Sequence, residues 1–271
     1  MTSGQKQWLM KTNIFPKVTL VGAGPGDPDL ITVKGVKSLK QANVVLYDAL
    51  INRELLKLVP KEAKTIFVGK RKGFISHSQD EINEMMVQKA FQYGHVIRLK
   101  GGDPFIFGRG AEEIDYIESF GIETEVISGI SSAIAVPASQ GITLTKRGIS
   151  ESFWVITGTT LDKELSNDVF LAAQSTATVV ILMGMDKLKE IVGIFKKFNK
   201  SEIPIAIIQN GTTKNEKIGV GTIDSILEIV ETQKLASPAI IVIGEVVKHS
   251  VKLRAFYEVV ASKNGAFQLY E

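Results

Sequence analysis

Short runs of apolar and β-branched residues alternate, along the first half of the chain, with stretches whose apolar residues recur at helical spacing. Such runs predict buried strands, and the helical stretches between them predict crossover connections. The pattern therefore indicates a mostly parallel sheet that is covered by helices on both faces. The predicted strands span residues 17–22, 43–48, 65–69, 95–99 and 123–127.

The clearest helical pattern covers residues 78–93. Its apolar positions follow i, i+3, i+4, i+8 spacing from Ile82 to Ala90, which is typical of one buried helix face. Ser78 and Glu81 stand three residues apart just ahead of this stripe, in the arrangement of a capping box. We therefore expect the helix to begin at Ser78.

The second half of the chain repeats the alternation and predicts a second α/β lobe. Its strands are expected at residues 153–157, 178–183, 203–209 and 239–246, with helices at 187–198 and 225–234. A polar stretch, residues 143–152, contains a glycine and two basic residues and reads as a linker. The expected domains are thus residues 17–142 and residues 153–250.

Composition excludes several classes of protein. The chain has no cysteine, so disulfides, thiolate nucleophiles and Cys-ligated metal sites are excluded. Its three histidines lie far apart in the sequence, and we expect no metal site. The net charge of +3 is too small for a general nucleic-acid binder. No membrane-spanning apolar run and no signal peptide are recognisable, and we therefore expect a cytoplasmic protein with no nucleic-acid or membrane partner.

A glycine-rich loop, residues 22–28 (GAGPGDP), follows the first predicted strand. With Asp48 at the end of the second strand, it resembles a dinucleotide fingerprint and suggests a nicotinamide-dependent oxidoreductase as an alternative function. However, Asp27 stands where the third glycine of that fingerprint belongs, and Pro25 removes a backbone N–H that phosphate would need. The ligand of this loop is therefore not expected to be a polyphosphate.

A second glycine-rich segment follows the fourth predicted strand. Gly101 and Gly102 allow the backbone to approach a ligand closely, and ligands bind at the carboxyl ends of strands in open α/β sheets. Asp103 supplies an acceptor that suits a cationic or hydroxyl-bearing ligand. The alternative is structural: a simple turn, followed by a helix start that carries Glu112 and Glu113 in its first turn.

Taken together, these segments resemble the tetrapyrrole methylase family. The resemblance runs from about residue 17 to 248 and rests on five segments: VGAGPGDPDLIT (21–32), VLYDALI (45–51), VGKRKG (68–73), RLKGGDPFIFGRGAEE (98–113) and SPAIIVIGEVV (237–247). It implies two α/β lobes of the tetrapyrrole methylase type, with the active site in the cleft between them. It also implies S-adenosyl-L-methionine as co-substrate, S-adenosyl-L-homocysteine as product, and no metal.

The resemblance also implies an activity and its residues. The activity is C-methylation of uroporphyrinogen III at C2 and C7, which gives precorrin-2 for siroheme or cobalamin biosynthesis; a later precorrin C-methyltransferase is the nearest alternative, and a non-enzymatic binding module is a further one. Asp48 would be the proton acceptor and Lys70 the donor, although Asp48 could instead cap a helix. The implied cofactor contacts are Pro25, Gly101, Gly102, Asp103, Ile106, Ser131, Ser132, Met183, Gly211 and Ala239.

The implied substrate carries eight carboxylates, which arginine can grip bidentately and lysine can attract as a point charge. Basic residues in or just after the signature segments and in the linker are the candidate partners: Arg53, Arg71, Lys100, Arg109, Lys146 and Arg147. Lys146 and Thr159 stand where the resemblance leads us to expect histidines. The resemblance finally implies a homodimer.

Overall fold

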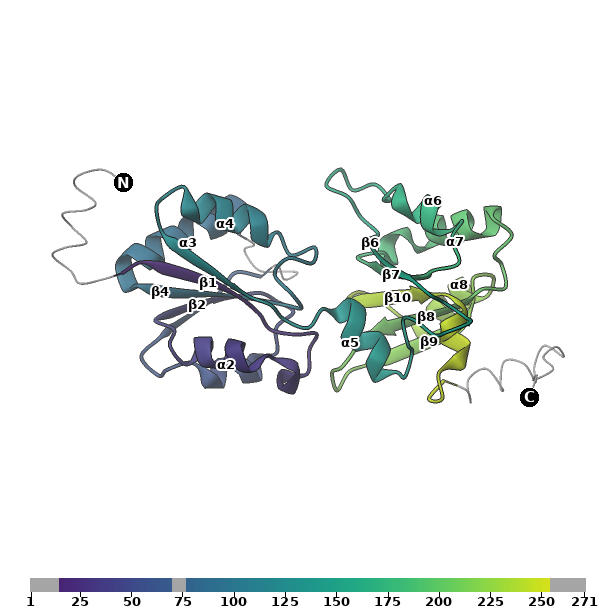
Figure 1. The fold of residues 1–271 in the computed structure, drawn as a ribbon, viewed down its shortest axis with the longest axis horizontal. Helices are drawn as coiled ribbons and strands as arrows, with labels where there is room; N and C mark the ends of the chain where they lie inside the picture. Colours follow the sequence, from purple (N-terminus) through teal and green to yellow (C-terminus); the bar gives the residue numbers. More distant parts are fainter. Residues whose placement is uncertain (1–14, 70–76, 254–271) are drawn as a thin grey trace. The chain divides into compact units, whose positions relative to one another are not determined.

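The structure is a computed structural model that describes residues 15–69 and 77–253 (Figure 1). Contacts within the chain divide it into two compact units, with the boundary between Ser131 and Ser132. Each unit contains one five-stranded sheet with flanking helices. The predicted fold class, a chain of two α/β lobes, is therefore confirmed. Within the described ranges, no helix is long and apolar enough to cross a bilayer.

The boundary between the units lies ahead of the predicted linker, residues 143–152. Leu144 packs in a core of the second unit, and the buried hydroxyl of Ser150 accepts a hydrogen bond from the Thr178 N–H at 3.0 Å. Helix α5 (Ser132–Ser139) packs in the same core. The whole stretch from α5 onward thus belongs to the second unit, because its buried contacts outweigh the polar composition that suggested a linker.

The first unit has a sheet of order β3-β2-β4-β1-β5 in which every neighbouring pair is parallel. This confirms the predicted parallel sheet, and each predicted strand is present to within a residue or two. The strands are β1 (Lys17–Gly22), β2 (Val44–Tyr47), β3 (Lys64–Phe67), β4 (His95–Lys100) and β5 (Glu123–Ile127). The helices are α2 (Val33–Leu39), α3 (Gln79–Tyr93) and α4 (Gly110–Glu118), with the short 3-10 helices η1 (Pro28–Leu30) and η2 (Arg53–Leu58).

Helices cover both faces of the first sheet. In Figure 1, α3 and α4 lie on one side of it and α2 on the other, over two separate apolar cores. Along β1 the side chains alternate between these cores, with Val18 and Leu20 in one and Val21 in the other. The predicted capping box is confirmed at the start of α3: the Ser78 hydroxyl accepts from the Glu81 N–H, and the Glu81 carboxylate accepts from the Ser78 N–H.

The second unit has a sheet of order β6-β7-β10-β8-β9. Only β6 and β7 are parallel; β10 is antiparallel to both β7 and β8, and β9 is antiparallel to β8. The strands are β6 (Phe153–Thr157), β7 (Thr178–Leu182), β8 (Pro204–Gln209), β9 (Lys217–Thr222) and β10 (Ala239–Ile243). The helices, besides α5, are α6 (Asp168–Ala172), α7 (Leu188–Lys197) and α8 (Ile226–Gln233), with η3 (Met185–Lys187) and η4 (Glu245–His249).

The parallel arrangement that strand–helix alternation favours does not extend to this sheet, because β8 and β9 form an antiparallel hairpin. The sequence reading missed β9, since its two glycines, Gly219 and Gly221, weaken the strand signal. The sheet is again covered on both faces: along β7, Val179 and Ile181 pack in the core under α6 and α7, and Val180 packs in the core under α5.

Candidate active site

The two predicted glycine-rich loops meet at the carboxyl edge of the first sheet. The segment after β1 and the segment after β4 form an isolated antiparallel bridge between Gly24 and Gly102. Its two backbone N–H···O distances are 3.2 Å, from Gly24 to Gly102, and 2.7 Å, from Gly102 to Gly24. The central strands of the parallel sheet therefore bring both loops to the place where open α/β sheets bind ligands.

A third backbone segment, which follows β5, closes against the same point. A Cβ atom built on Gly129 would lie 2.1 Å from the Gly102 carbonyl oxygen, and one built on Gly22 would lie 2.4 Å from the Gly129 Cα atom. Both obstacles are backbone atoms that cannot turn aside. Only glycine fits at this junction, and the close approach explains both glycines without any appeal to phosphate binding.

Asp103 holds this junction together. One carboxylate oxygen accepts the Phe105 N–H at 2.8 Å, and the other accepts the Gly129 N–H at 3.0 Å. The turn interpretation of this segment is therefore correct for its backbone. A carboxylate has about four lone-pair sites, so Asp103 keeps the capacity to accept from a ligand as well. The neighbouring apolar side chains are exposed, Ile106 by 44% and Phe105 by 54%, which adds a hydrophobic surface beside this acceptor.

The loop after β1 uses its acidic residue structurally. The Asp27 carboxylate caps η1 by accepting the Asp29 N–H at 2.9 Å. Pro25 lies half-buried just before it, and the Asn52 side chain holds the loop by donating to the Gly26 carbonyl at 2.9 Å. A carboxylate thus occupies the helix terminus that a dinucleotide fingerprint would offer to pyrophosphate, which weakens the oxidoreductase alternative.

Asp48, the predicted proton acceptor, is held by an arginine. The Arg98 guanidinium, from β4, donates through Nη2 to Asp48 Oδ1 at 2.6 Å. The Arg98 side chain is only 3% exposed, whereas that of Asp48 is 28% exposed and can be reached from solvent. Asp48 therefore forms an ion pair instead of the alternative helix cap. Sequence reasoning assigned Arg98 no role, although a cation within an otherwise buried strand calls for an anionic partner.

Arg98 belongs to a buried network of charges. Its Nε donates to Glu113 Oε1 at 3.1 Å, and the Lys100 ammonium donates to Glu113 Oε2 at 2.8 Å. Glu113 also accepts from the Gln79 side chain at 3.0 Å. Burial opposes the charge on Arg98, but the attraction of Asp48 and Glu113 raises its pKa above the ordinary value. Burial, together with the repulsion of Arg98, lowers the pKa of Lys100.

This network changes the interpretation of Lys100. Its side chain is 5% exposed and its ammonium is paired with Glu113, so its position does not favour contact with a substrate carboxylate. Arg109, in contrast, is exposed at the start of α4 and forms a surface ion pair with Glu112 at 2.5 Å. Arg53 is exposed at the start of η2. Lys70 and Arg71 lie outside the described residues.

In the second unit, three of the predicted cofactor contacts lie at one edge of the sheet. Met183 follows β7, Ala239 begins β10 and Gly211 follows β8. The register pairs Ile240 with Leu182 and Ala239 with Gln209, so all three contacts are at neighbouring strand ends. Topology thus brings together residues that are far apart in sequence.

Met183 at that edge has an unusual backbone. Its φ is 55°, and the residue is 51% exposed. The Thr159 hydroxyl donates to the Met183 carbonyl at 2.9 Å, which fixes this left-handed conformation from the neighbouring strand end. Thr159 is one of the two residues that depart from the family pattern, and here it supports the backbone of a predicted contact.

The remaining predicted residues are placed as follows. Ser131 is buried at the end of the first unit, and Ser132 begins α5 in the second. Lys146 and Arg147 are exposed in a turn that the Lys146 N–H closes by donating to the Ser150 carbonyl at 2.8 Å. Among the described residues there is no group of three or more His, Asp or Glu side chains that could hold a metal ion.

Comparisons with known proteins agree with this geometry. The sequence profile of the Tetrapyrrole (Corrin/Porphyrin) Methylases matches residues 17–227. The uroporphyrinogen-III C-methyltransferase of Methanocaldococcus jannaschii is 49% identical over 233 residues, which cover 85% of this chain and 96% of that protein. The siroheme synthase of Actinobacillus pleuropneumoniae serotype 7 is 43% identical over 236 residues, 87% of this chain but only 48% of that longer protein.

Among solved structures, the uroporphyrin-III C-methyl transferase of Thermus thermophilus complexed with S-adenyl homocysteine has a similar fold. Its TM-score is 0.74 at 33% sequence identity, with 86% of this chain and 99% of that chain covered. Sequence profile, relatives and fold therefore agree over most of the chain. This chain belongs to the tetrapyrrole methylase family.

Proposed function

We propose that this chain transfers two methyl groups from S-adenosyl-L-methionine to carbon, at C2 and then C7 of uroporphyrinogen III, and so forms precorrin-2. The observation that carries the proposal is at the carboxyl edge of the first sheet, where Gly24, Gly102 and Gly129 meet and where Asp48, at the end of β2, is held by Arg98. The relative that is 49% identical is named for the same reaction.

The described residues fit the proposed co-substrate. S-adenosyl-L-methionine supplies an electrophilic methyl group on a sulfonium, and it also carries hydroxyl groups, amino groups and an aliphatic chain. Gly101 and Gly102 present backbone without side chains, Asp103 presents an acceptor, and Ile106 presents an exposed apolar surface. In the second unit, Ser132, Met183, Gly211 and Ala239 are the contacts proposed by resemblance, together with Pro25 and Ser131 of the first unit.

The first task of these residues is positioning. Carbon methylation requires the electron-rich ring carbon to lie in line with the bond that breaks, and orientation of this kind is worth on the order of 7–11 kcal/mol in intramolecular reactions. Backbone segments serve this purpose well, since the junction at Gly129 leaves no side-chain rotamers to reorganise. Rigid placement is therefore the main contribution that we assign to the glycine loops.

The second task is removal of a proton from the methylated macrocycle, and we assign it to Asp48. Its ion pair with Arg98 fixes the carboxylate, and its partial exposure leaves one face open to a substrate. General acid–base catalysis contributes typically about 10²–10⁴-fold to a rate. Lys70, the proposed proton donor, lies outside the described residues.

The third task is recognition of an acidic macrocycle. We propose Arg53, Arg109, Lys146 and Arg147, with Arg71, as carboxylate partners, all of which are exposed where they are described. Arg109 already binds a carboxylate, that of Glu112, so a substrate carboxylate could replace it at little cost in desolvation. Lys100 is left out of this set, because its ammonium is paired with Glu113 in the interior.

The test is mass spectrometry of the tetrapyrrole after incubation of the chain with uroporphyrinogen III and a methyl donor labelled at the methyl group. We expect a mass increase of two labelled methyl groups. A product from a later precorrin, with uroporphyrinogen III unchanged, would indicate a sister methyltransferase. Calorimetric titration with S-adenosyl-L-homocysteine and with NADH distinguishes a methyltransferase from a nicotinamide-dependent oxidoreductase. Tight binding of NADH alone would overturn the proposal.

Asp48→Asn tests the assignment of the base. Asparagine keeps an acceptor for Arg98 but cannot take a proton, so we expect turnover to fall by about 100-fold or more. The dissociation constant for S-adenosyl-L-homocysteine should change by less than about threefold, because Asp48 is not among the proposed cofactor contacts. An Asp48→Asn variant with full turnover would remove Asp48 as the base.

We also propose that the chain acts as a homodimer in the cytoplasm and that its product serves siroheme or cobalamin biosynthesis. Sedimentation velocity of the full chain tests the homodimer, and a single species at monomer mass would overturn it. Fractionation of cells that express the chain at its natural level tests the cytoplasmic location, and recovery of the chain with membranes would contradict it.

A further inference from the structure

The connection between β8 and β9 contains two residues with side chains in the left-handed backbone conformation. Asn210 and Thr212, on either side of Gly211, have φ values of 50° and 64°. A left-handed conformation is uncommon for any residue with a side chain, and for a β-branched threonine it is an outlier. Such strain persists only where surrounding contacts determine the shape of the loop.

Glu216 supplies those contacts. One carboxylate oxygen accepts the Thr212 N–H at 2.7 Å, and the other accepts a hydrogen bond from the Gln140 side-chain amide. The Glu216 N–H also donates to the Thr213 carbonyl at 3.2 Å, which closes the connection on itself. A single carboxylate therefore ties the strained loop to the segment that follows α5.

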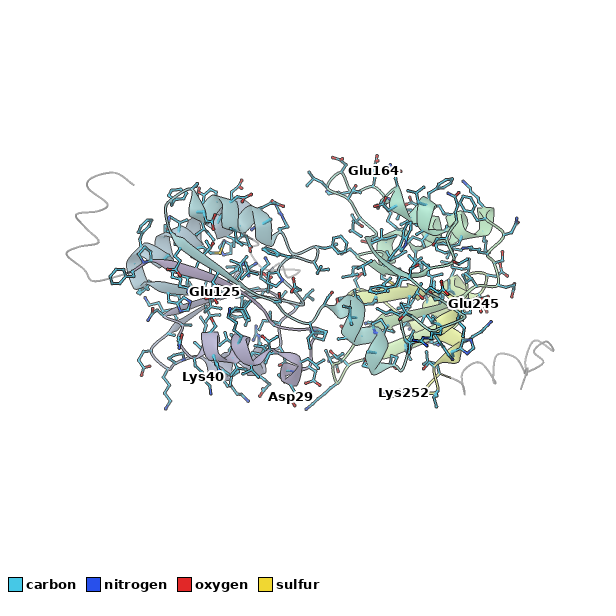
Figure 2. All side chains as sticks on the ribbon, in the orientation of Figure 1. Asp29, Lys40, Glu125, Glu164, Glu245 and Lys252 are labelled. Atoms are coloured by element: carbon cyan, nitrogen blue, oxygen red, sulfur yellow. The ribbon has the colours of Figure 1, made fainter. Side chains whose placement is uncertain are left out.

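That segment is itself anchored within the second unit. The Ser250 hydroxyl donates to the Gln140 carbonyl at 2.6 Å, and Lys252, labelled in Figure 2, donates to the Ser139 carbonyl at 2.6 Å. On the loop side, a Cβ atom on Gly211 would lie 2.3 Å from a methyl group of Val136 in α5. Gly211 is thus packed directly against the helix to which Glu216 ties its loop.

The peptide unit between Gly211 and Thr212 shows what this arrangement controls. The unit is planar and trans, so its N–H and C=O point in opposite directions. When the Thr212 N–H is fixed on Glu216, the Gly211 carbonyl is fixed pointing the other way. The orientation of the Gly211 carbonyl is therefore set by the side chain of Glu216, five residues further along the chain.

We propose that Glu216 is a positioning residue for the co-substrate: it aims the Gly211 carbonyl at a donor group of S-adenosyl-L-methionine. This rests on the proposed function, in which Gly211 contacts the co-substrate. Glu216 touches neither reactant in this scheme and acts through the peptide unit alone. Its loss should weaken binding of the co-substrate and leave the tetrapyrrole side of the reaction unchanged.

The test compares three variants of the full chain by calorimetric titration with S-adenosyl-L-homocysteine. Glu216→Ala removes the acceptor of the Thr212 N–H, and we expect affinity to fall by about 5- to 30-fold. Glu216→Gln keeps a carbonyl for that N–H, and the Gln140 amide can turn to pair with the new amide, so affinity should stay within about threefold of the parent. Glu164→Ala is the control, since this exposed glutamate has a side chain without a hydrogen bond to any described residue (Figure 2).

Steady-state kinetics distinguish a positioning role from loss of folding. For Glu216→Ala we expect a raised KM for S-adenosyl-L-methionine, with KM for uroporphyrinogen III and kcat at saturating co-substrate unchanged. Gln140→Ala should raise KM for S-adenosyl-L-methionine by a smaller factor, and it provides a second variant if Glu216→Ala does not fold. Equal affinity in Glu216→Ala, Gln140→Ala and the parent would overturn the inference, whereas failure of the parent to bind S-adenosyl-L-homocysteine would overturn the proposed function itself.

Discussion

Balanced charge in the buried network of the first unit leads to a quantitative prediction for Glu113→Gln. Among the described residues, the network contains two cations, Arg98 and Lys100, and two anions, Asp48 and Glu113. Glu113 is fully buried, and the side chains of Arg98 and Lys100 are 3% and 5% exposed. Neutralising Glu113 leaves one positive charge without compensation in a region that water does not reach.

The size of the effect follows from these burials. Breaking a buried ion pair by removing one partner costs about 3–5 kcal/mol, far more than the roughly 0–1 kcal/mol of a surface pair. Lys100→Met alone should cost less, because Glu113 retains Arg98 and the Gln79 amide as donors. In the double variant, Lys100→Met with Glu113→Gln, one cation again faces one anion. We therefore expect the loss of unfolding free energy in the double variant to be about 1–3 kcal/mol smaller than the sum of the losses in the two single variants.

Hydrogen exchange followed by mass spectrometry is the appropriate assay, because the chain has two units whose unfolding need not coincide. Peptides from β4 should show faster exchange in Glu113→Gln, and peptides from β10, in the second unit, should exchange as in the parent. The reasoning is refuted if the two single effects simply add in the double variant, or if Glu113→Gln costs less than about 1 kcal/mol.

Two further predictions concern backbone packing and pH. Gly129→Ala places a Cβ atom 2.1 Å from the Gly102 carbonyl oxygen, so it should lower stability by at least about 1–3 kcal/mol and abolish S-adenosyl-L-homocysteine binding. The control is Gly193→Ala in α7, which should raise Tm because nothing lies within 4 Å of the added Cβ. Equal Tm shifts in the two variants would contradict this reasoning. Hydrogen bonds from two lysines, first Lys34, lower the pKa of Glu125 (Figure 2) below its ordinary 4.5, so its stabilisation is present above that pH and is lost as pH falls through the lowered pKa. Glu125→Gln should therefore cost about 0.5–1 kcal/mol in urea unfolding at pH 7 and progressively less on acidification, and a cost that grows in acid would be the opposite of this expectation.

Much of the fold could be predicted because buried strands leave a strong pattern. β1 and β5 begin and end where the sequence predicts, and the capping box fixes the start of α3. β9 escaped prediction, since its glycines have no strand propensity and its place is decided by pairing with β8. The direction of β10 is likewise set by tertiary pairing, which no local pattern records.

The part of the candidate site that depends on local sequence could be predicted. The sequence alone indicates close backbone approach at Gly101 and Gly102, followed by an acceptor at Asp103. Arg98 was missed, because its partners Asp48 and Glu113 come from segments that only folding brings together. The strained loop before Glu216 left no signal either, since left-handed threonine has no sequence signature.

The strand order of the first sheet has a consequence for how the chain is made. β1 is the first strand of this sheet to be synthesised, yet its two neighbours, β4 and β5, follow about 70 to 100 residues later. At a translation rate of roughly 5–20 residues per second, this apolar segment emerges from the ribosome several seconds before either edge can find its hydrogen-bonding partner. A nascent chain of this kind exposes an unpaired apolar strand to holding chaperones, and the sheet of the first unit is complete only after β5 has been synthesised.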